Sequence, residues 1–109
     1  MNKTEKLIED AIKYIEENYS DPSISLESVS EYLNISVSYL SMLLSKLKGI
    51  SFNKYLVKVR MEKAKELLKF TLEKVVNVAT LCGYNEVYYF SHSFKKYTGM
   101  SPKEFRNNG

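Results

Sequence analysis

The sequence predicts an all-α fold in which seven helices form two helix-turn-helix subdomains joined by one continuous linker helix. The first observation behind this prediction is a tandem repeat, because the segment from Leu26 to Tyr55 recurs as the segment from Val75 to Phe105. Each copy reads as a short helix, a tight turn and a longer helix. The second observation is composition: the 109 residues contain only 4 Gly and 2 Pro, and no alternating apolar and polar run indicates a strand. We therefore assign residues 1–50 to a first subdomain, 51–70 to the linker helix and 71–109 to a second subdomain.

The two copies keep a fixed register except at their turns. Beyond the turn, matched residues lie 50 positions apart, whereas before the turn they lie 49 apart, as Ser30 and Ala79 do. One residue inserted in the second turn accounts for the difference. The small side chains of Ser30 and Ala79 suit the point where two helices cross closely, and Asn34 and Gly83 can supply the positive φ that the turn requires.

The first three helices follow from local signals. We expect the first helix to begin after Thr4 and to run to about Tyr19, because apolar residues recur there at helical spacing until Pro22 ends the pattern. The hydroxyl of Ser25 is expected to cap the second helix, and that of Ser36 the third. Each hydroxyl can accept a hydrogen bond from a free backbone N–H of the first turn.

The linker helix and the second copy complete the set. One helix without Gly or Pro is expected from about Phe52 to Lys69, and its buried side should consist of Tyr55, Leu56, Val59, Ala64, Leu67 and Leu68. The fifth, sixth and seventh helices are expected at about Glu73–Leu81, Glu86–Tyr97 and Pro102–Asn107. Left-handed glycines should end the third and sixth helices, at Gly49 and Gly99. Ser101 and Glu104 are spaced as a capping box for the seventh.

The longer helix of each copy is apolar on one side and polar on the other, as a helix that reads DNA must be. Core packing is the interpretation for Leu40, Leu43, Leu44 and Leu47 in the first copy and for Phe90, Phe94 and Tyr97 in the second. The outward positions are the candidates for base reading: Val37, Ser38, Ser41, Met42, Ser45, Val87, Tyr88, Ser91 and His92. None of them is Arg, Asn or Gln, which make the bidentate pairs with guanine and adenine, so we expect modest base discrimination.

Charge is distributed unevenly along the chain. Residues 1–24 carry three Lys against six Asp or Glu, a net charge of −3, so the total of +3 leaves +6 for residues 25–109. Phosphate contacts are expected from the N-terminal amides of the third and sixth helices and from Ser36, Lys46, Lys48, Arg60, Asn85, Lys95 and Lys96. A merely solvated helix face would give the same charge count, and this alternative stays open for each lysine.

Catalysis and metal binding have little support. The only Cys and the only His, Cys82 and His92, lie on different helices with no third partner, and a single Cys forms no internal disulfide. Cys82 stands where the first copy has Leu33, which indicates a small buried apolar residue. No apolar stretch approaches the roughly 20 residues of a membrane span. We expect no catalytic residue, metal, cofactor, small-molecule ligand or membrane contact, and a cytoplasmic location.

Two longer motifs carry a family resemblance. The linker contains Tyr55-Leu56-x3-Arg60-Met61-x2-Ala64-x2-Leu67-Leu68. The second copy contains Val78-Ala79-x3-Gly83-Tyr84-x4-Tyr89-Phe90-Ser91-x2-Phe94-Lys95-Lys96-x2-Gly99-x-Ser101-Pro102-x2-Phe105-Arg106. With these motifs the chain resembles, over nearly its whole length, the DNA-binding domain of the AraC/XylS family of bacterial transcription regulators.

The resemblance implies seven helices, double-stranded DNA as the partner, and transcription regulation that is more often activation, with RNA polymerase as a further partner. By position, it places base reading on Ser38, Ser41, Met42, Val87, Tyr88 and His92. The sequence departs from the family pattern at Met42 and His92, where Arg is frequent. This departure leaves the fold intact but puts the strength and identity of base readout in question.

Two interpretations of the whole chain stay open. The opening helix resembles that of family members found as output domains of two-component response regulators, in which a receiver domain precedes the DNA-binding part. The chain is then either such a domain cut from a longer protein or a stand-alone regulator, and we favour the former. The alternative function is a helical protein-interaction module, related to the family, that has lost base readout.

Overall fold

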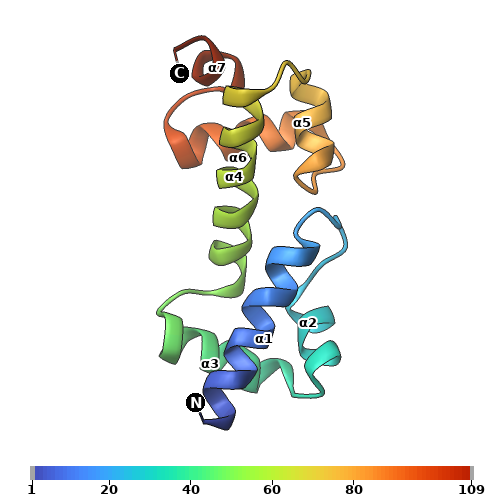
Figure 1. Ribbon diagram of the computed structural model, residues 1–109, viewed down its shortest axis with the longest axis vertical. Coiled ribbons are helices and arrows are strands. Elements are labelled where there is room, and N and C mark those ends of the chain that lie inside the picture. The colour runs from blue at the N-terminus through green and yellow to red at the C-terminus, as the bar shows by residue number, and fades with distance from the viewer. Residues whose placement is uncertain (1, 109) are drawn as a thin grey trace. The chain divides into compact units, whose positions relative to one another are not determined.

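The computed structural model describes residues 2–108, and the regular structure in this range is entirely helical (Figure 1). The helices are α1 (Lys3–Asn18), α2 (Leu26–Leu33), α3 (Val37–Lys48), α4 (Phe52–Phe70), α5 (Val75–Leu81), α6 (Val87–Thr98) and α7 (Pro102–Asn108). The predicted all-α class is therefore confirmed, and the predicted helix ends agree within two residues. None of these helices is long and apolar enough to cross a membrane.

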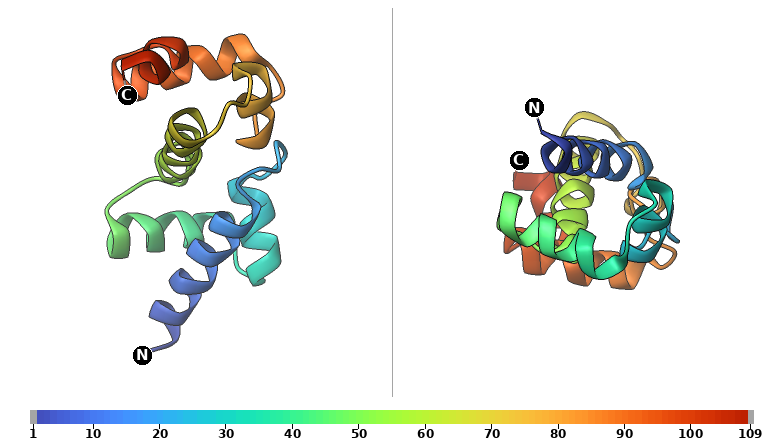
Figure 2. Two further views of the ribbon diagram at one scale, coloured as in Figure 1. Left: turned by 45° about the horizontal axis from the view of Figure 1, so that its top comes forward. Right: turned by 90° about the horizontal axis from the view of Figure 1, so that it is seen from below.

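Two compact units make up the described chain (Figure 2). Unit 1 comprises residues 2–19 and 23–57, and unit 2 comprises residues 20–22 and 58–108. The boundary passes through α4, so the first residues of that helix complete the core of unit 1 and the rest completes the core of unit 2. Each unit buries its own set of apolar side chains.

In unit 1, α1 packs against α2 and α3, and α2 packs against α3. The core consists of residues from all four helical segments and the α1–α2 loop: Ile8, Ala11, Ile15, Ile24, Val29, Leu40, Leu43, Leu44, Phe52 and Leu56. A hydrogen bond joins α4 to α1, because the Tyr55 hydroxyl donates to Glu16 Oε2 at 3.0 Å. Burial and this bond raise the pKa of Tyr55 to about 12.

In unit 2, α6 packs against α5 and α7. A row of aromatic rings forms the centre of this unit, with centroid distances of 5.5 Å from Tyr84 to Phe90, 5.9 Å from Phe90 to Phe94 and 5.4 Å from Phe94 to Phe105. Neighbouring rings packed edge-on or tilted in this way are favoured over stacked sandwiches. Apolar side chains buried around these rings include Met61, Ala64, Leu68, Val78, Ala79 and Cys82.

The predicted buried state of Cys82 is confirmed, and burial raises the pKa of its thiol to about 11. The predicted anchors near the ends of α3 and α6 are wrong. Leu47 and Tyr97 are 44% and 40% exposed, although they continue the apolar stripes, because each lies in the last turn of its helix. The Tyr97 hydroxyl instead donates to Glu62 Oε2 on α4 at 2.9 Å.

Most helix ends are capped as predicted. Ser25 Oγ accepts from Ser28 N at 3.0 Å, and Ser36 Oγ accepts from Tyr39 N at 3.1 Å. Gly49 and Gly99 end α3 and α6 in the left-handed conformation. The capping box of α7 is also present: Ser101 Oγ accepts from Glu104 N at 3.1 Å, and Glu104 Oε1 accepts from Ser101 N at 2.9 Å.

The first helix is the exception to this agreement. It begins at Lys3, two residues earlier than predicted, and its cap is Asn2, since Asn2 Oδ1 accepts from Glu5 N at 2.9 Å. Thr4 lies inside the helix, and its hydroxyl donates to Asn2 Oδ1 at 2.8 Å. Both residues favour caps, and the earlier one takes the position here because its side-chain carbonyl can accept both bonds.

The two helix-turn-helix turns have the same hydrogen bonds. Asn34 has φ 57° and Gly83 has φ 90°. The next residue in each turn donates back to the helix: Ile35 N to Ser30 O at 3.0 Å, and Tyr84 N to Ala79 O at 2.9 Å. Each residue of the second turn lies 49 positions after its equivalent in the first: Gly83 after Asn34, Tyr84 after Ile35 and Ala79 after Ser30. The inserted residue of the second copy therefore lies beyond the hydrogen-bonded turn, at Asn85.

The positive φ of Gly83 gives a testable prediction. A β-branched side chain at this φ is strained, so Gly83→Val should lower the free energy of unfolding by about 1–3 kcal/mol. Urea unfolding followed by circular dichroism measures the change. The matched control is Asn34→Gly at the equivalent position of the first turn, which should leave stability unchanged or slightly higher. Equal stability of Gly83→Val and the wild type would show that the turn does not need a left-handed residue.

Candidate nucleic-acid interface

One side of α3 is buried and the other is exposed. Leu40, Leu43 and Leu44 face the core. The exposed stripe follows helical spacing on the opposite side and consists of Ser38, Ser41, Met42 and Ser45, while Val37 is partly exposed at the start of the helix. Met42 is 43% exposed, so an apolar group able to contact a thymine methyl stands among three hydroxyls. The structure thus brings the five predicted candidates of the first copy onto one surface.

The equivalent surface of α6 is more varied. Phe90 and Phe94 are buried, whereas Tyr88 is 77% exposed and His92 and Lys95 are also exposed. Val87 and Ser91 are partly exposed next to them. These positions also follow helical spacing, so the predicted candidates of the second copy form a second continuous surface, with a phenol, an imidazole and an ammonium group.

The first turns of the two helices differ in electrostatics. Ser36 caps α3 with a neutral hydroxyl, and Glu86 caps α6 with a carboxylate that accepts from Tyr88 N at 2.9 Å and from Tyr89 N at 3.2 Å. The sequence predicts phosphate contacts from the N-terminal amides of both helices. For α6 this assignment needs correction, because Glu86 already occupies two of these amides with negative charge. Asn85, directly before it, is exposed.

Sequence reasoning missed the role of Glu86, although a signal was present. Glu86 stands 50 positions after Ser36, so the repeat register itself identifies it as the cap of α6. The sequence predicts a sixth helix that begins at Glu86, so Glu86 counts there as its first residue and not as its cap. Glu86 is exposed and directly precedes Val87 and Tyr88 at the start of α6.

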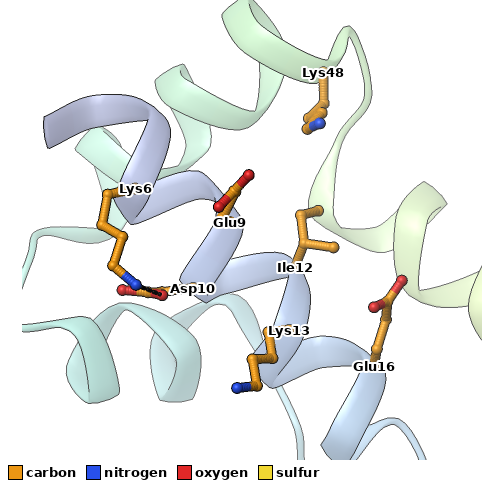
Figure 3. Close-up of a pocket in the computed structure, with 7 residues that line it drawn as sticks. All are labelled: Lys6, Glu9, Asp10, Ile12, Lys13, Glu16 and Lys48. Atoms are coloured by element: carbon orange, nitrogen blue, oxygen red, sulfur yellow. Dashed lines mark hydrogen bonds and ion pairs between the residues drawn. The ribbon is translucent and has the colours of Figure 1, made fainter. Parts of the chain in front are cut away.

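The lysines assigned to phosphate lie in the last turns of the two helices. Lys46, Lys95 and Lys96 are exposed there, where positive charge also complements the helix C-terminus. Lys48 differs from them. It lines a surface hollow of unit 1 with residues of α1, and it extends toward the face that carries Glu9, Ile12 and Glu16 (Figure 3).

Lys48 is consequently a weaker phosphate candidate than the other three lysines, because it shares its hollow with carboxylates of α1. The hollow contains further charges of both signs, including Lys6, whose ammonium group pairs with Asp10 Oδ1 at 3.0 Å. Among the residues that the structure describes, no group of three or more His, Cys, Asp or Glu could hold a metal ion. This hollow is therefore a mixed-charge surface of α1 and the end of α3.

Arg60 is the clearest correction to the phosphate candidates. Only 9% of the residue is exposed, and its Nη2 donates to the Asp21 carbonyl at 3.0 Å within unit 2. Its guanidinium lies over the Tyr84 ring, 5.3 Å from the centroid, which is a favourable cation–π distance. Burial lowers the pKa of Arg60. The Arg60 guanidinium therefore stabilises the fold of unit 2 and is too buried to bind a phosphate.

A second arginine has a comparable structural role. Arg106 Nε donates to the Leu68 carbonyl at 2.9 Å, and its Nη2 donates to the Thr71 carbonyl at 3.2 Å. These carbonyls lie at and just beyond the end of α4, where they have no partner within the helix. The two arginines thus fix the loops that surround the core of unit 2.

Comparison with known proteins places this geometry in a family. A family model described as a helix-turn-helix domain matches residues 29–108. The uncharacterized HTH-type transcriptional regulator YijO of Escherichia coli (strain K12) is 41% identical over 105 residues, which are 96% of this chain and 37% of YijO.

Two solved structures are closely similar to this domain. The C-terminal domain of AraT, a response regulator from Geobacillus stearothermophilus, is 40% identical with a TM-score of 0.95, covering 99% of this chain and 89% of that one. The C-terminal domain of the two-component response regulator yesN from Fusobacterium nucleatum subsp. nucleatum ATCC 25586 is 41% identical with a TM-score of 0.87, covering 96% and 99%.

Two helix-turn-helix units with polar outer faces, matched in this way, define a DNA-binding domain of a transcription regulator and not an enzyme. The chain belongs to the AraC family of these regulators. It spans 37% of the length of YijO and 35% of the length of the raffinose operon transcriptional regulatory protein RafR of Pediococcus pentosaceus.

The burial of Arg60 leads to a prediction that separates folding from DNA binding. Arg60→Met should lower the free energy of unfolding by about 2–3 kcal/mol, because a charge-assisted hydrogen bond and a cation–π contact are lost. Urea unfolding measures this loss, and Lys58→Met, an exposed cation on the same helix, is the control expected to change stability little. A phosphate-binding role would instead appear as unchanged stability together with a weaker salt dependence of DNA affinity.

Proposed function

We propose that this domain binds double-stranded DNA sequence-specifically, with α3 and α6 entering successive segments of the major groove. The observation that carries the proposal is the equivalence of these two helices. Each has 12 residues, is capped at its start, follows a left-handed turn and exposes a polar stripe opposite its buried side. Recognition helices contact bases mainly through their N-terminal halves, which is where both stripes begin. In this proposal residues 1–50 and 71–109 are the two reading subdomains, and residues 51–70 are the linker helix.

The exposed stripes supply the base contacts of this proposal. In the first subdomain these are Val37, Ser38, Ser41, Met42 and Ser45, and in the second they are Val87, Tyr88, Ser91 and His92. Phosphate contacts come from Ser36, Lys46, Asn85, Lys95 and Lys96. Ser36 suits this role because its oxygen accepts from Tyr39 N while its own O–H can still donate to a phosphate oxygen.

We also propose that the domain is the output part of a longer two-component regulator, with a receiver domain before it. The support is that the chain spans only about a third of its curated relatives and that the solved structures named above are C-terminal domains of response regulators. Such a regulator acts in the cytoplasm, and we assign it an activating role in which RNA polymerase is the protein partner.

Titration with DNA tests the central proposal. A pool of random duplexes should bind at low salt and weaken strongly as salt is raised, because cations that neutralise phosphates release counterions. A selection from the pool should then enrich one sequence with two contacted segments about one helical turn apart. Absence of binding to any duplex at low salt would contradict the proposal and favour a protein-interaction module instead.

Substitutions distinguish the two kinds of contact. Lys95→Ala should weaken binding to all duplexes alike and reduce the salt slope by about one, because it removes one phosphate contact. Lys103→Ala on α7 is the charge-matched control and should leave affinity nearly unchanged.

Base contacts should respond differently. Ser41→Ala or Tyr88→Ala should relax the preference at one or two base pairs of the selected site, by about 1–3 kcal/mol of discrimination each. Competition between selected and single-base-pair variant duplexes measures this change. A uniform loss from Lys95→Ala, Ser41→Ala and Tyr88→Ala alike would mean that the reading surfaces are assigned incorrectly.

A further inference from the structure

Glu86, the N-terminal cap of α6, places a negative charge at the start of the second proposed reading helix. Both carboxylate oxygens of Glu86 are engaged, one with Tyr88 N at 2.9 Å and the other with Tyr89 N at 3.2 Å. These bonds hold the side chain in one conformation although it is exposed. A carboxylate has about four acceptor sites in total. Each oxygen of Glu86 therefore keeps an acceptor site beyond the one that the helix uses.

No positive charge on α6 offsets this carboxylate near the start of the helix. Residues 87–94 contain no Lys or Arg, and the first cation along the helix is Lys95. In the first subdomain the equivalent cap is the neutral Ser36, which can donate to a phosphate as well as accept. The two reading helices thus meet DNA with different chemistry at their first turns: one can bind a phosphate, and the other repels it.

An acceptor-only group in the major groove favours one base. Guanine presents two acceptors there, and thymine presents an acceptor and a methyl group. Adenine has an amino donor, but its N7 acceptor lies directly beside it. Cytosine presents its N4 amino donor, and Glu or Asp accepting from this group is an established form of base contact.

We propose that Glu86 is a specificity-determining residue of the second reading helix and that it selects cytosine by accepting from the N4 amino group. The proposal rests on the DNA-binding mode proposed above. Its carboxylate is held ready by the Tyr88 and Tyr89 amides, so little side-chain freedom is lost when the base is bound. The same charge disfavours duplexes that place a phosphate or another acceptor at this point, which adds discrimination by repulsion.

Site selection with matched variants tests this assignment. Glu86→Ser gives α6 the same cap residue as α3, so folding should be retained, and circular dichroism checks it. The wild type should enrich a cytosine at one position of the segment bound by α6. For Glu86→Ser, the wild-type preference at that position, expected at about tenfold or more, should disappear, while affinity for non-specific duplexes rises.

Two further variants separate base reading from charge and capping. Glu66→Gln on α4 makes the same charge change at another exposed carboxylate and should leave the cytosine preference intact. Glu86→Gln should shift the preference from cytosine toward adenine, because an amide matches the donor and acceptor pair of that base.

The outcomes are distinguishable. A wild-type motif that Glu86→Ser leaves unchanged at every position would overturn the role of Glu86 and leave the proposed function standing. Equal effects of Glu86→Ser and Glu66→Gln on the motif would likewise overturn it, since charge alone would be responsible. If the wild type enriches no sequence at low salt, the proposed function fails and this inference fails with it.

Discussion

The left-handed residue after the first helix of each pair is the constraint on which the other features depend. Asn34 and Gly83 turn the chain with a positive φ, and the amides of the following residues donate to the carbonyls of Ser30 and Ala79. After this turn α3 packs against α2 and α6 packs against α5, and the small side chains of Ser30 and Ala79 are buried. Once this packing is fixed, the apolar sides of α3 and α6 face their cores and the opposite sides face solvent. The polar stripes are exposed because the turns orient the helices.

Some of the Lys and Arg side chains stabilise the fold and others are exposed on the surface, and residue type alone does not tell the two groups apart. Arg60 and Arg106 are committed to backbone carbonyls within unit 2, and Lys48 faces the carboxylates of α1. The cations that remain on α3 and α6 are exposed lysines in the last turns. A domain with a net charge of +3 therefore has fewer charges free for a polyanion than its composition indicates. In the proposed DNA-binding mode, affinity therefore depends on a small number of lysines, and discrimination between bases depends on neutral or acidic groups.

Features with local causes could be predicted from the sequence, and features with distant partners could not. Helix periodicity, the Ser25 and Ser36 caps and the left-handed glycines each depend on residues within one or two turns. From the sequence Arg60 is expected to be a surface cation. Its hydrogen-bond partner, the Asp21 carbonyl, lies 39 positions away, and a backbone carbonyl has no sequence pattern that identifies it as a partner. Glu86 was overlooked for another reason: Glu is a common residue of helix interiors and first turns, and the repeat register alone marks it as a cap. The assignment of individual residues to bases depends on the position of DNA, which neither the sequence nor the fold contains.

The extra residue of the second copy lies where it affects the surface at the start of α6 but not the stability of the turn or the core. Asn85 lies after the hydrogen-bonded turn and before the Glu86 cap, so it lengthens the approach to α6 while the turn and the core of unit 2 keep the pattern of the first copy. Because Asn85 is exposed, a substitution there alters the surface at the start of α6 and removes no buried side chain. In the proposed DNA-binding mode, a domain built in this way would change its target sequence at little cost in stability, and its two copies would do so independently.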